Sequence, residues 1–264
     1  MQGLLIPQSA SILSTTGAGI AGNIDPSLNP ALEKITHPSL QFSLNRWLGE
    51  MKGSRSVYYW GDKYPQHFSI QSWGAEDLEL WDKNPDNSPL GRFGVHLVSA
   101  AYSLSHHFNT PYRFGFKIQT HYLHLFTSNL TGLSFDFGSL VPLAENIKIG
   151  AVLQNVGVSF KNSEKADFPL TAGLGVGINL PIIKSTLLAD FLNVNSENEY
   201  RIGITTQWKW INFKAGRTLS ENKNANALGF SFNYRRWQVH YGIYLHENSP
   251  VLGTPIFLDV RRYL

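Results

Sequence analysis

Long stretches of alternating apolar and polar residues constrain the fold more than any other feature of this chain. The clearest stretch covers residues 112–127, where Phe114 and Phe116 fall on one face and Lys117 and Gln119 on the other. A repeat of two residues is typical of a β-strand, whereas an amphipathic helix repeats about every 3.6 residues. The sequence therefore predicts an all-β fold in which each strand has one apolar and one polar face.

Residues that favour turns divide the chain into about 14 such segments after residue 38. Each strand and its connection then takes roughly 19 residues, a spacing typical of barrel hairpins. We interpret the segments as a closed antiparallel transmembrane β-barrel. The predicted strands cover 39–48, 54–61, 67–81, 92–108, 112–127, 130–141, 147–160, 169–180, 185–195, 200–209, 211–219, 225–236, 238–247 and 254–264.

Alternation alone does not say whether the apolar face points into a soluble core or out into lipid. Many segments reach about ten residues, enough to span a bilayer at a steep tilt, whereas strands of soluble proteins average about five or six. Long polar connections at 82–91 and 161–168 alternate with tight turns at 210–211 and 237–238, as in outer-membrane barrels. These features favour an outward apolar face and a location in the bacterial outer membrane.

Aromatic residues and charge content favour the same interpretation. Only 16% of the residues are charged, against about 25% in average proteins. No run of about 18 apolar residues predicts a transmembrane helix. A barrel of this kind must be exported, so we expect residue 1 to lie near the mature terminus, after a signal peptide has been removed.

Aromatic side chains gather near the predicted strand ends, where interfacial girdles would place them: Trp47, Tyr58, Tyr59, Trp60, Trp81, Trp208, Trp210 and Trp237.

Residues 1–38 differ from the barrel region 39–264, because they are rich in Gly, Ala, Ser, Thr and Pro. One short helix is expected near 30–35, with Asn29 as its cap. The stretch 17–22 matches the dinucleotide pattern G-x-G-x-x-G, but no strand leads closely into it and two prolines exclude a long helix after it. Glycine lets backbone approach backbone, so we predict that this segment plugs the lumen or caps its periplasmic end. The proposed anchors of the plug and of a later strand turn are Gly17, Gly19, Gly22, Asp25, Pro26, Asn29, Pro30, Asn155 and Gly157.

Several charged residues fall on the polar faces of the predicted strands and are expected to point into the lumen. Opposite charges there can pair and close the interior, which is a more common arrangement than a charge filter for solutes. These residues are Arg113, Lys117, Asp136, Lys148, Arg201, Lys209 and Lys214.

The sequence offers little support for catalysis or for bound cofactors. Cysteine is absent, which excludes thiolate nucleophiles and thiolate metal sites. His121 and His124 are three residues apart on one strand and face opposite sides, so no metal site is predicted. Ser231 and His240 flank a tight turn and could meet, but no orienting carboxylate or oxyanion donor is evident. The net charge is +3 without a basic block, which argues against nucleic-acid binding.

An acidic cluster lies beside Trp73 and Trp81. Calcium or a partner protein could use it, but a solvated loop end is the expected reading. Its members are Glu76, Asp77, Glu79 and Asp82.

A set of short motifs resembles the PorV/PorQ family of outer-membrane barrels, whose architecture is similar to that of FadL-like transporters of hydrophobic compounds. No single motif is specific, and the resemblance lies in their shared order. The matching segments are 25–27, 29–31, 115–117, 136–138, 154–157, Pro169, 189–190 and 213–217. The C-terminus departs from the usual pattern, since it ends on Leu264 rather than on an aromatic residue.

This resemblance implies a non-enzymatic barrel that acts in type IX protein secretion or in cell-surface attachment, with extracellular loops that dock secreted proteins. The alternative is a FadL-like channel for hydrophobic small molecules, which would need an apolar cavity and a side opening at a kinked strand. A soluble β-sandwich adhesive domain is the second alternative. Outer-membrane lipid is an expected partner in the first two cases, and no cofactor is predicted in any.

Overall fold

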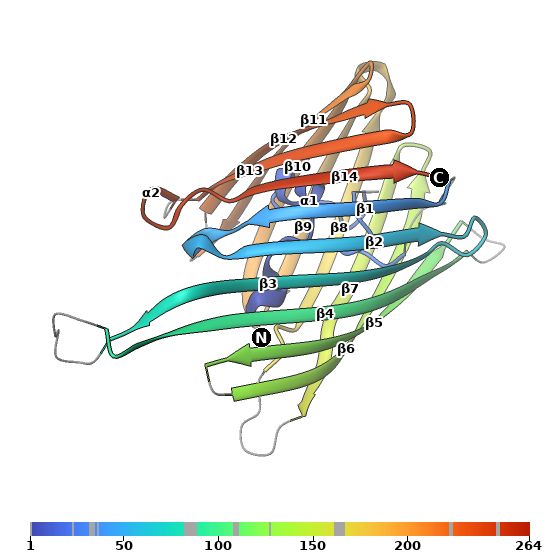
Figure 1. The fold of residues 1–264 in the computed structure, drawn as a ribbon. Helices are drawn as coiled ribbons and strands as arrows, with labels where there is room; N and C mark the ends of the chain where they lie inside the picture. The colour runs from blue at the N-terminus through green and yellow to red at the C-terminus, as the bar shows by residue number, and fades with distance from the viewer. Residues whose placement is uncertain are drawn as a thin grey trace.

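The computed structural model describes residues 2–22, 24–31, 35, 37–81, 89–107, 111–126, 128–160, 167–221, 224–246 and 249–264. Fourteen antiparallel strands form a closed barrel in which each strand pairs with its neighbours in sequence, and β1 pairs with β14 to complete the ring (Figure 1). The strands are β1 (Ser39–Arg46), β2 (Lys52–Trp60), β3 (Gln66–Leu80), β4 (Gly91–His107), β5 (Arg113–Leu125), β6 (Ser128–Ala144), β7 (Ile147–Phe160), β8 (Thr171–Leu180), β9 (Ser185–Val194), β10 (Glu197–Trp208), β11 (Ile211–Ser220), β12 (Asn224–Tyr234), β13 (Trp237–His246) and β14 (Ile256–Tyr263).

The predicted number of strands is confirmed, and so is the closed antiparallel arrangement. The boundaries agree closely, with the larger differences at places such as the start of β10, which lies at residue 197 rather than 200. The two-residue repeat of apolar and polar residues locates the strands well, because each residue of a barrel strand faces either the lumen or the outside in turn.

The apolar faces of the strands point outward. Leu174 and Leu228 expose 59% and 54% of their surface, whereas the inward-facing Asp136 and Ser231 expose 1% and 0%. A sandwich would bury the large apolar residues instead, so the prediction of a soluble β-sandwich is wrong. Among the described residues, no helix is long and apolar enough to cross a membrane.

The two ends of the barrel differ in their connections. At one end, here called the turn end, short links such as 209–210 and 235–236 join the strands. At the opposite end, here called the loop end, the connections include the longer 81–90, 161–170 and 247–255. Most of these longer connections include residues outside the described part of the chain, as does Asp82 of the predicted acidic cluster.

Three irregularities interrupt the regular pairing of the described strands, one of them between Pro142 and Ala144 near the end of β6. In β7, Gln154 and Asn155 together face Asp136 of β6, and Asn155 adopts a left-handed conformation with φ of 60°. In β3, the register with β4 shifts between Ala75 and Leu78. Such bulges add an unpaired residue to one strand and bend it locally.

The outward apolar face leads to a depth-dependent prediction. Leu174→Arg, near the middle of β8, is expected to lower the free energy of unfolding in lipid by about 2–4 kcal/mol, the usual cost of a basic residue at the bilayer midplane. Leu170→Arg, just before β8, is the matched control, and its cost should be about 0–1 kcal/mol. Reversible unfolding in phospholipid vesicles measures both. Equal costs would contradict the assignment of this face to lipid.

Candidate functional site in the barrel interior

The N-terminal segment lies inside the barrel rather than beside it (Figure 1). It begins with a short 3-10 helix, η1 (Gln2–Leu5), followed by α1 (Ala10–Ser14), in which every residue is buried. α1 contacts strands β11 to β14. Of the helix expected near 30–35, positions 32–34 lie outside the described part of the chain and the described positions 30, 31 and 35 are not helical, whereas α1 was not predicted.

Inward-facing glycines of the strands make room for this segment. A Cβ atom on Gly115 would lie 2.0 Å from the carbonyl carbon of Pro30, and one on Gly216 would lie 2.3 Å from that of Thr15. Only glycine permits such close approach of two backbones. These glycines were visible in the sequence on the polar faces, but their alternation alone did not reveal what would pack on them. A Cβ on Gly150 or Gly242 would likewise meet backbone atoms of the segment, and one on Gly138, Gly175 or Gly229 would meet its side chains.

Carboxylates from the barrel wall bind the backbone of the segment. The N–H of Ala10 donates to Oδ2 of Asp259 in β14 at 2.9 Å. The N–H groups of Gly19 and Ile20 donate to Oδ2 of Asp190 in β9, at 2.6 and 3.0 Å. These charge-assisted bonds attach the segment at two points of the wall. They also explain why residues 17–22 are rich in glycine. Without side chains in the way, the N–H groups of this stretch can come within hydrogen-bond distance of a carboxylate of the wall.

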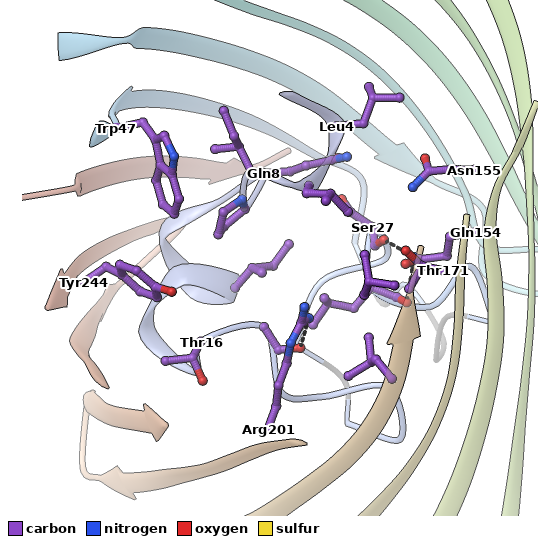
Figure 2. Close-up of a pocket in the computed structure, with 18 of the residues that line it drawn as sticks. Leu4, Gln8, Thr16, Ser27, Trp47, Gln154, Asn155, Thr171, Arg201 and Tyr244 are labelled. Atoms are coloured by element: carbon purple, nitrogen blue, oxygen red, sulfur yellow. Dashed lines mark hydrogen bonds between the residues drawn. The ribbon is translucent and has the colours of Figure 1, made fainter. Parts of the chain in front are cut away.

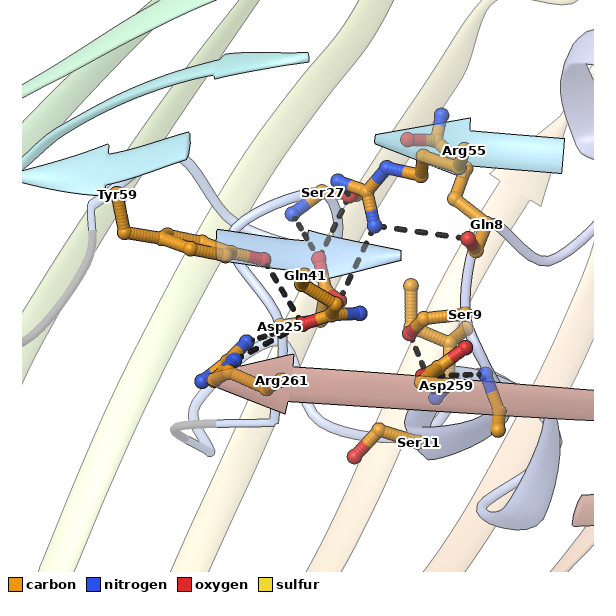
Figure 3. Close-up of polar contacts among 12 residues, drawn as sticks. Gln8, Ser9, Ser11, Asp25, Ser27, Gln41, Arg55, Tyr59, Asp259 and Arg261 are labelled. Carbon is orange, nitrogen blue, oxygen red and sulfur yellow. Dashed lines mark hydrogen bonds and ion pairs between the residues drawn. The ribbon is translucent and has the colours of Figure 1, made fainter. Parts of the chain in front are cut away.

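A buried ion pair provides a third attachment (Figure 3). NH1 of Arg55 in β2 lies 3.3 Å from Oδ2 of Asp25, and NH2 donates to Oγ of Ser27 at 2.7 Å. The N–H and hydroxyl of Ser27 both donate to Oδ1 of Asp25. Burial by itself raises the pKa of the Asp25 carboxyl, but Arg55 and Ser27 outweigh burial and hold that pKa well below its usual range. Asp25 is therefore ionised in the folded protein.

Side-chain amides complete the set of attachments. Nε2 of Gln154 in β7 donates to the carbonyls of Ser27 and Leu28, at 2.9 and 3.1 Å. Nδ2 of Asn29 donates to the carbonyl of Ser139 in β6 at 2.9 Å, while its Oδ1 accepts from the N–H of Ala31. Asn29 and Pro30 thus belong to the part of the segment that lies against β5 and β6.

Asn155 and Gly157 lie in the wall rather than in the segment. The N–H of Asn155 donates to Oδ1 of Asp136 at 2.7 Å, and its Nδ2 donates to the carbonyl of Pro169 at 3.1 Å. A Cβ on Gly157 would meet the carbonyl oxygen of Leu133 at 2.7 Å. The two residues therefore shape the β7 bulge and the strand pairing next to it.

Six of the seven predicted lumenal charges face the interior of the barrel. Lys117 forms a buried ion pair with Asp136, and Arg201 forms one with Glu199 at 2.6 Å. Lys214 contacts the hydroxyl of Ser11. Arg113 shares the inward face of β5 with Lys117, and Lys148 lines an interior cavity.

Lys209 does not face the lumen. It is exposed in the turn between β10 and β11, with its ammonium 5.8 Å from the centre of the Trp208 ring. β10 ends at Trp208, so the alternation that placed Lys209 inward stops one residue before it.

Large apolar side chains occupy the interior at the loop end. Trp47, Trp73, Tyr244 and Phe257 form an aromatic cluster, with ring centres 5.4 Å apart for Trp47 and Tyr244 and 5.7 Å apart for Trp73 and Phe257. Leu4 and Ile6 of the N-terminal segment pack against this cluster, as do Leu97 and Leu123 of the wall. Trp47 was predicted to belong to an interfacial girdle and lies inside instead, and Tyr59 is likewise buried in the wall.

The segment separates two kinds of cavity. One of about 80 Å³ lies between the segment and the aromatic cluster, where Trp47, Tyr244 and Leu4 face it (Figure 2). Another of about 380 Å³ lies at the turn end and is lined mainly by polar and charged side chains. A neighbouring cavity of about 240 Å³ reaches Lys148 and Gly22. The aromatic cluster therefore lies at the loop end, although the small cavity beside it is also lined by polar side chains such as Gln154, Thr171 and Arg201, and the turn-end cavity is mainly polar.

The arrangement around His240 does not form a catalytic triad. His240 lies directly opposite Ser231 on β12 and Asp259 on β14. Ser231 accepts a hydrogen bond from Asn212, and Asp259 accepts one from Ala10. Within the described residues, no hydrogen bond links His240 to either of its neighbours, and Nδ1 of His240 has no partner.

Comparison with solved structures reveals a shared fold. The Pseudomonas putida toluene transporter TodX matches with a TM-score of 0.76 at 10% identity, over 98% of this chain and 99% of that one. The CymD monoaromatic hydrocarbon channel matches with a TM-score of 0.69 at 12% identity, over 98% of both chains. A Pseudomonas aeruginosa FadL homologue matches with a TM-score of 0.65 at 11% identity, over 98% of this chain and 99% of that one.

The chain shares the barrel fold of these three proteins. Its identity to them is low, so the likeness establishes the fold and not the activity. No protein-family model matches the sequence. No curated protein is similar to it in sequence either.

Proposed function

We propose that this protein is a non-enzymatic channel of the bacterial outer membrane for hydrophobic small molecules, and that residues 1–38 plug its lumen. The aromatic cluster of Trp47, Trp73, Tyr244 and Phe257 inside the loop end carries the proposal. A channel for water-soluble solutes has a polar bore, whereas apolar ligands are bound by concave apolar surfaces. The outward apolar face supports the location in the membrane.

Small aromatic hydrocarbons are the proposed substrates. Two of the structural neighbours are described as a toluene transporter and a monoaromatic hydrocarbon channel. Aromatic side chains favour offset-stacked or edge-to-face contacts with aromatic ligands. The side opening that such a channel needs remains a prediction, and the bulges of β3 and β7 are the irregular parts of the wall where we expect it.

The channel is preferred over a scaffold for protein secretion. The PorV/PorQ resemblance rests on short motifs, and the comparisons give it no further support, whereas the structural neighbours are channels. A secretion role predicts that deletion changes the secreted or surface proteome, and the channel predicts no such change.

Entry of the hydrophobic dye N-phenyl-1-naphthylamine into cells with an intact lipopolysaccharide layer tests the channel. Cells that express the protein should take up the dye faster than cells without it. Trp73→Gln should slow this entry by roughly fivefold or more, since an unpaired amide in an apolar site costs about 1–3 kcal/mol. Trp81→Gln is the matched control, because Trp81 follows the same strand but is exposed outside.

Folding of each variant is checked by the shift in electrophoretic mobility on heating. Dye entry that is independent of expression would overturn the channel. Equal rates for the Trp73 and Trp81 variants would show that the loop-end cluster is not on the route.

A further inference from the structure

The polar cavity at the turn end has a composition that the proposed channel does not explain. It measures about 380 Å³ and lies on the other side of the N-terminal segment from the aromatic cluster. Strands from both sides of the β1–β14 closure contribute to it, together with Ser11 and Asp25 of the segment. Its volume lies within the range of small-molecule sites, which is about 300–1,000 Å³. A ligand that enters it meets mainly polar groups.

Two partly buried cations line this cavity, and neither has a carboxylate within ion-pair distance among the described residues. Arg261 of β14 donates from Nε and NH2 to Oε1 of Gln41, at 3.0 and 2.5 Å, and its guanidinium lies 4.5 Å from the centre of the Tyr59 ring (Figure 3). Lys214 of β11 contacts the hydroxyl of Ser11. Across the described residues, neither cation forms an ion pair. Their partners are neutral, so the positive charge of both stays uncompensated by direct contact.

Of the two acidic residues of the cavity, Asp25 is engaged elsewhere through both oxygens, whereas Asp259 is engaged through Oδ2 alone and its Oδ1 has no hydrogen-bond partner among the described residues. Asp25 is paired with Arg55 and accepts from Ser27. Asp259 accepts the N–H of Ala10 through Oδ2. Lys184 adds a third positive charge at the rim of the cavity. Because Arg55 neutralises Asp25, Asp259 is the remaining negative charge against three positive ones.

Neutral donors surround the same space. The amide side chains of Gln207, Asn212 and Gln238 line it. An unpaired buried charge is costly, and charge-assisted hydrogen bonds from Arg or Lys to an oxyanion are about twice as strong as neutral ones. An anion in this cavity therefore gains from both cations and finds amide donors for its remaining oxygens.

We propose that the turn-end cavity is a binding site for a small oxyanion, the carboxylate of a small organic acid, held by Arg261 and Lys214. Arg presents a planar fork that matches two carboxylate oxygens, and Lys supplies a compact charge beside it. The site does not depend on the hydrophobic route at the loop end. Dye entry at the loop end and anion binding at the turn end can fail separately.

Fluorine NMR of trifluoroacetate with the full-length barrel, refolded in a neutral detergent, tests this site. Saturable line broadening is expected, and acetate should compete for it more strongly than phosphate or chloride at constant ionic strength. Trifluoroethanol is the matched probe without charge and should show no saturable effect. Stronger competition by phosphate than by acetate would overturn the assignment to a carboxylate.

Lys214→Met and Arg261→Met should each weaken trifluoroacetate binding by about tenfold, the loss typical of one charge-assisted hydrogen bond. Lys52→Met is the control, because Lys52 is exposed at the opposite end of the barrel. Asn212→Asp is a second variant of nearly unchanged size, which adds a negative charge while both cations remain. It should also weaken binding. Binding that is absent, or that survives all three substitutions, would overturn the site.

Discussion

Deletion of residues 2–31 is expected to raise the conductance of the barrel in planar bilayers by roughly tenfold or more. The wall closes through β1 and β14 without help from the segment, so the barrel should still fold. In the intact protein the segment packs directly against inward glycines such as Gly115 and Gly216. In the deletion variant these glycines would face an open bore. Barrels of this size need internal filling to stay closed, and slightly larger porins conduct freely.

A point substitution provides a second route to the same state. Gly115→Leu places a side chain where the backbone of Pro30 now lies, so the segment must shift. Gly91→Leu is the control, because nothing lies within 4 Å of a Cβ at that position. Single-channel recordings of the four proteins compare the effects. If the full chain and the deletion conduct equally, the N-terminal segment does not plug the lumen.

Arg55→Met is expected to lower the free energy of unfolding by about 3–5 kcal/mol. Asp25 would be left ionised and buried without its partner, which is the usual source of large losses in broken buried pairs. Ser27 would lose the guanidinium that donates to its hydroxyl at 2.7 Å. Urea unfolding in detergent, followed by tryptophan fluorescence, measures the change.

The double variant Arg55→Met with Asp25→Asn separates charge from packing. It should recover much of the loss, because no uncompensated charge remains in the interior. Arg46→Met is the control on an exposed pair, since Arg46 and Glu50 lie 3.6 Å apart with most of both side chains in solvent. That control should change stability little. A double variant as unstable as Arg55→Met alone would contradict the electrostatic explanation.

The N-terminal segment lies between the aromatic cluster and the turn-end cavity, and this position limits the route that a hydrophobic substrate can take. A hydrophobic molecule that enters at the loop end meets aromatic side chains first and then the N-terminal segment. Beyond the segment it would meet the turn-end cavity, whose lining is mainly polar and charged. We therefore expect a hydrophobic substrate to leave through the wall or to require movement of the segment, rather than to pass along the axis.

Local pattern was sufficient for the wall of this protein. Alternation predicted the strand spans, since each strand residue faces either in or out and its type follows that choice. It also predicted Lys117 and Asp136 as inward charges. Lys209 was misplaced because a turn ends the alternation, and Trp47 because a strand-end aromatic can fold inward as well as outward.

The sequence predicted that residues 1–38 plug the lumen or cap its end, but the individual contacts inside the barrel were decided by tertiary structure. Ala10 binds Asp259, Gly19 binds Asp190 and Arg55 binds Asp25, and partners in the first two pairs are more than 100 residues apart. No local repeat encodes such contacts, because they depend on where closure of the barrel brings distant strands. The sequence by itself determined a closed wall with one apolar and one polar face. Only the folded chain determined which groups of the wall bind the N-terminal segment, such as Asp190 and Asp259, and that an aromatic cluster lies on its loop-end side and a mainly polar cavity on its turn-end side.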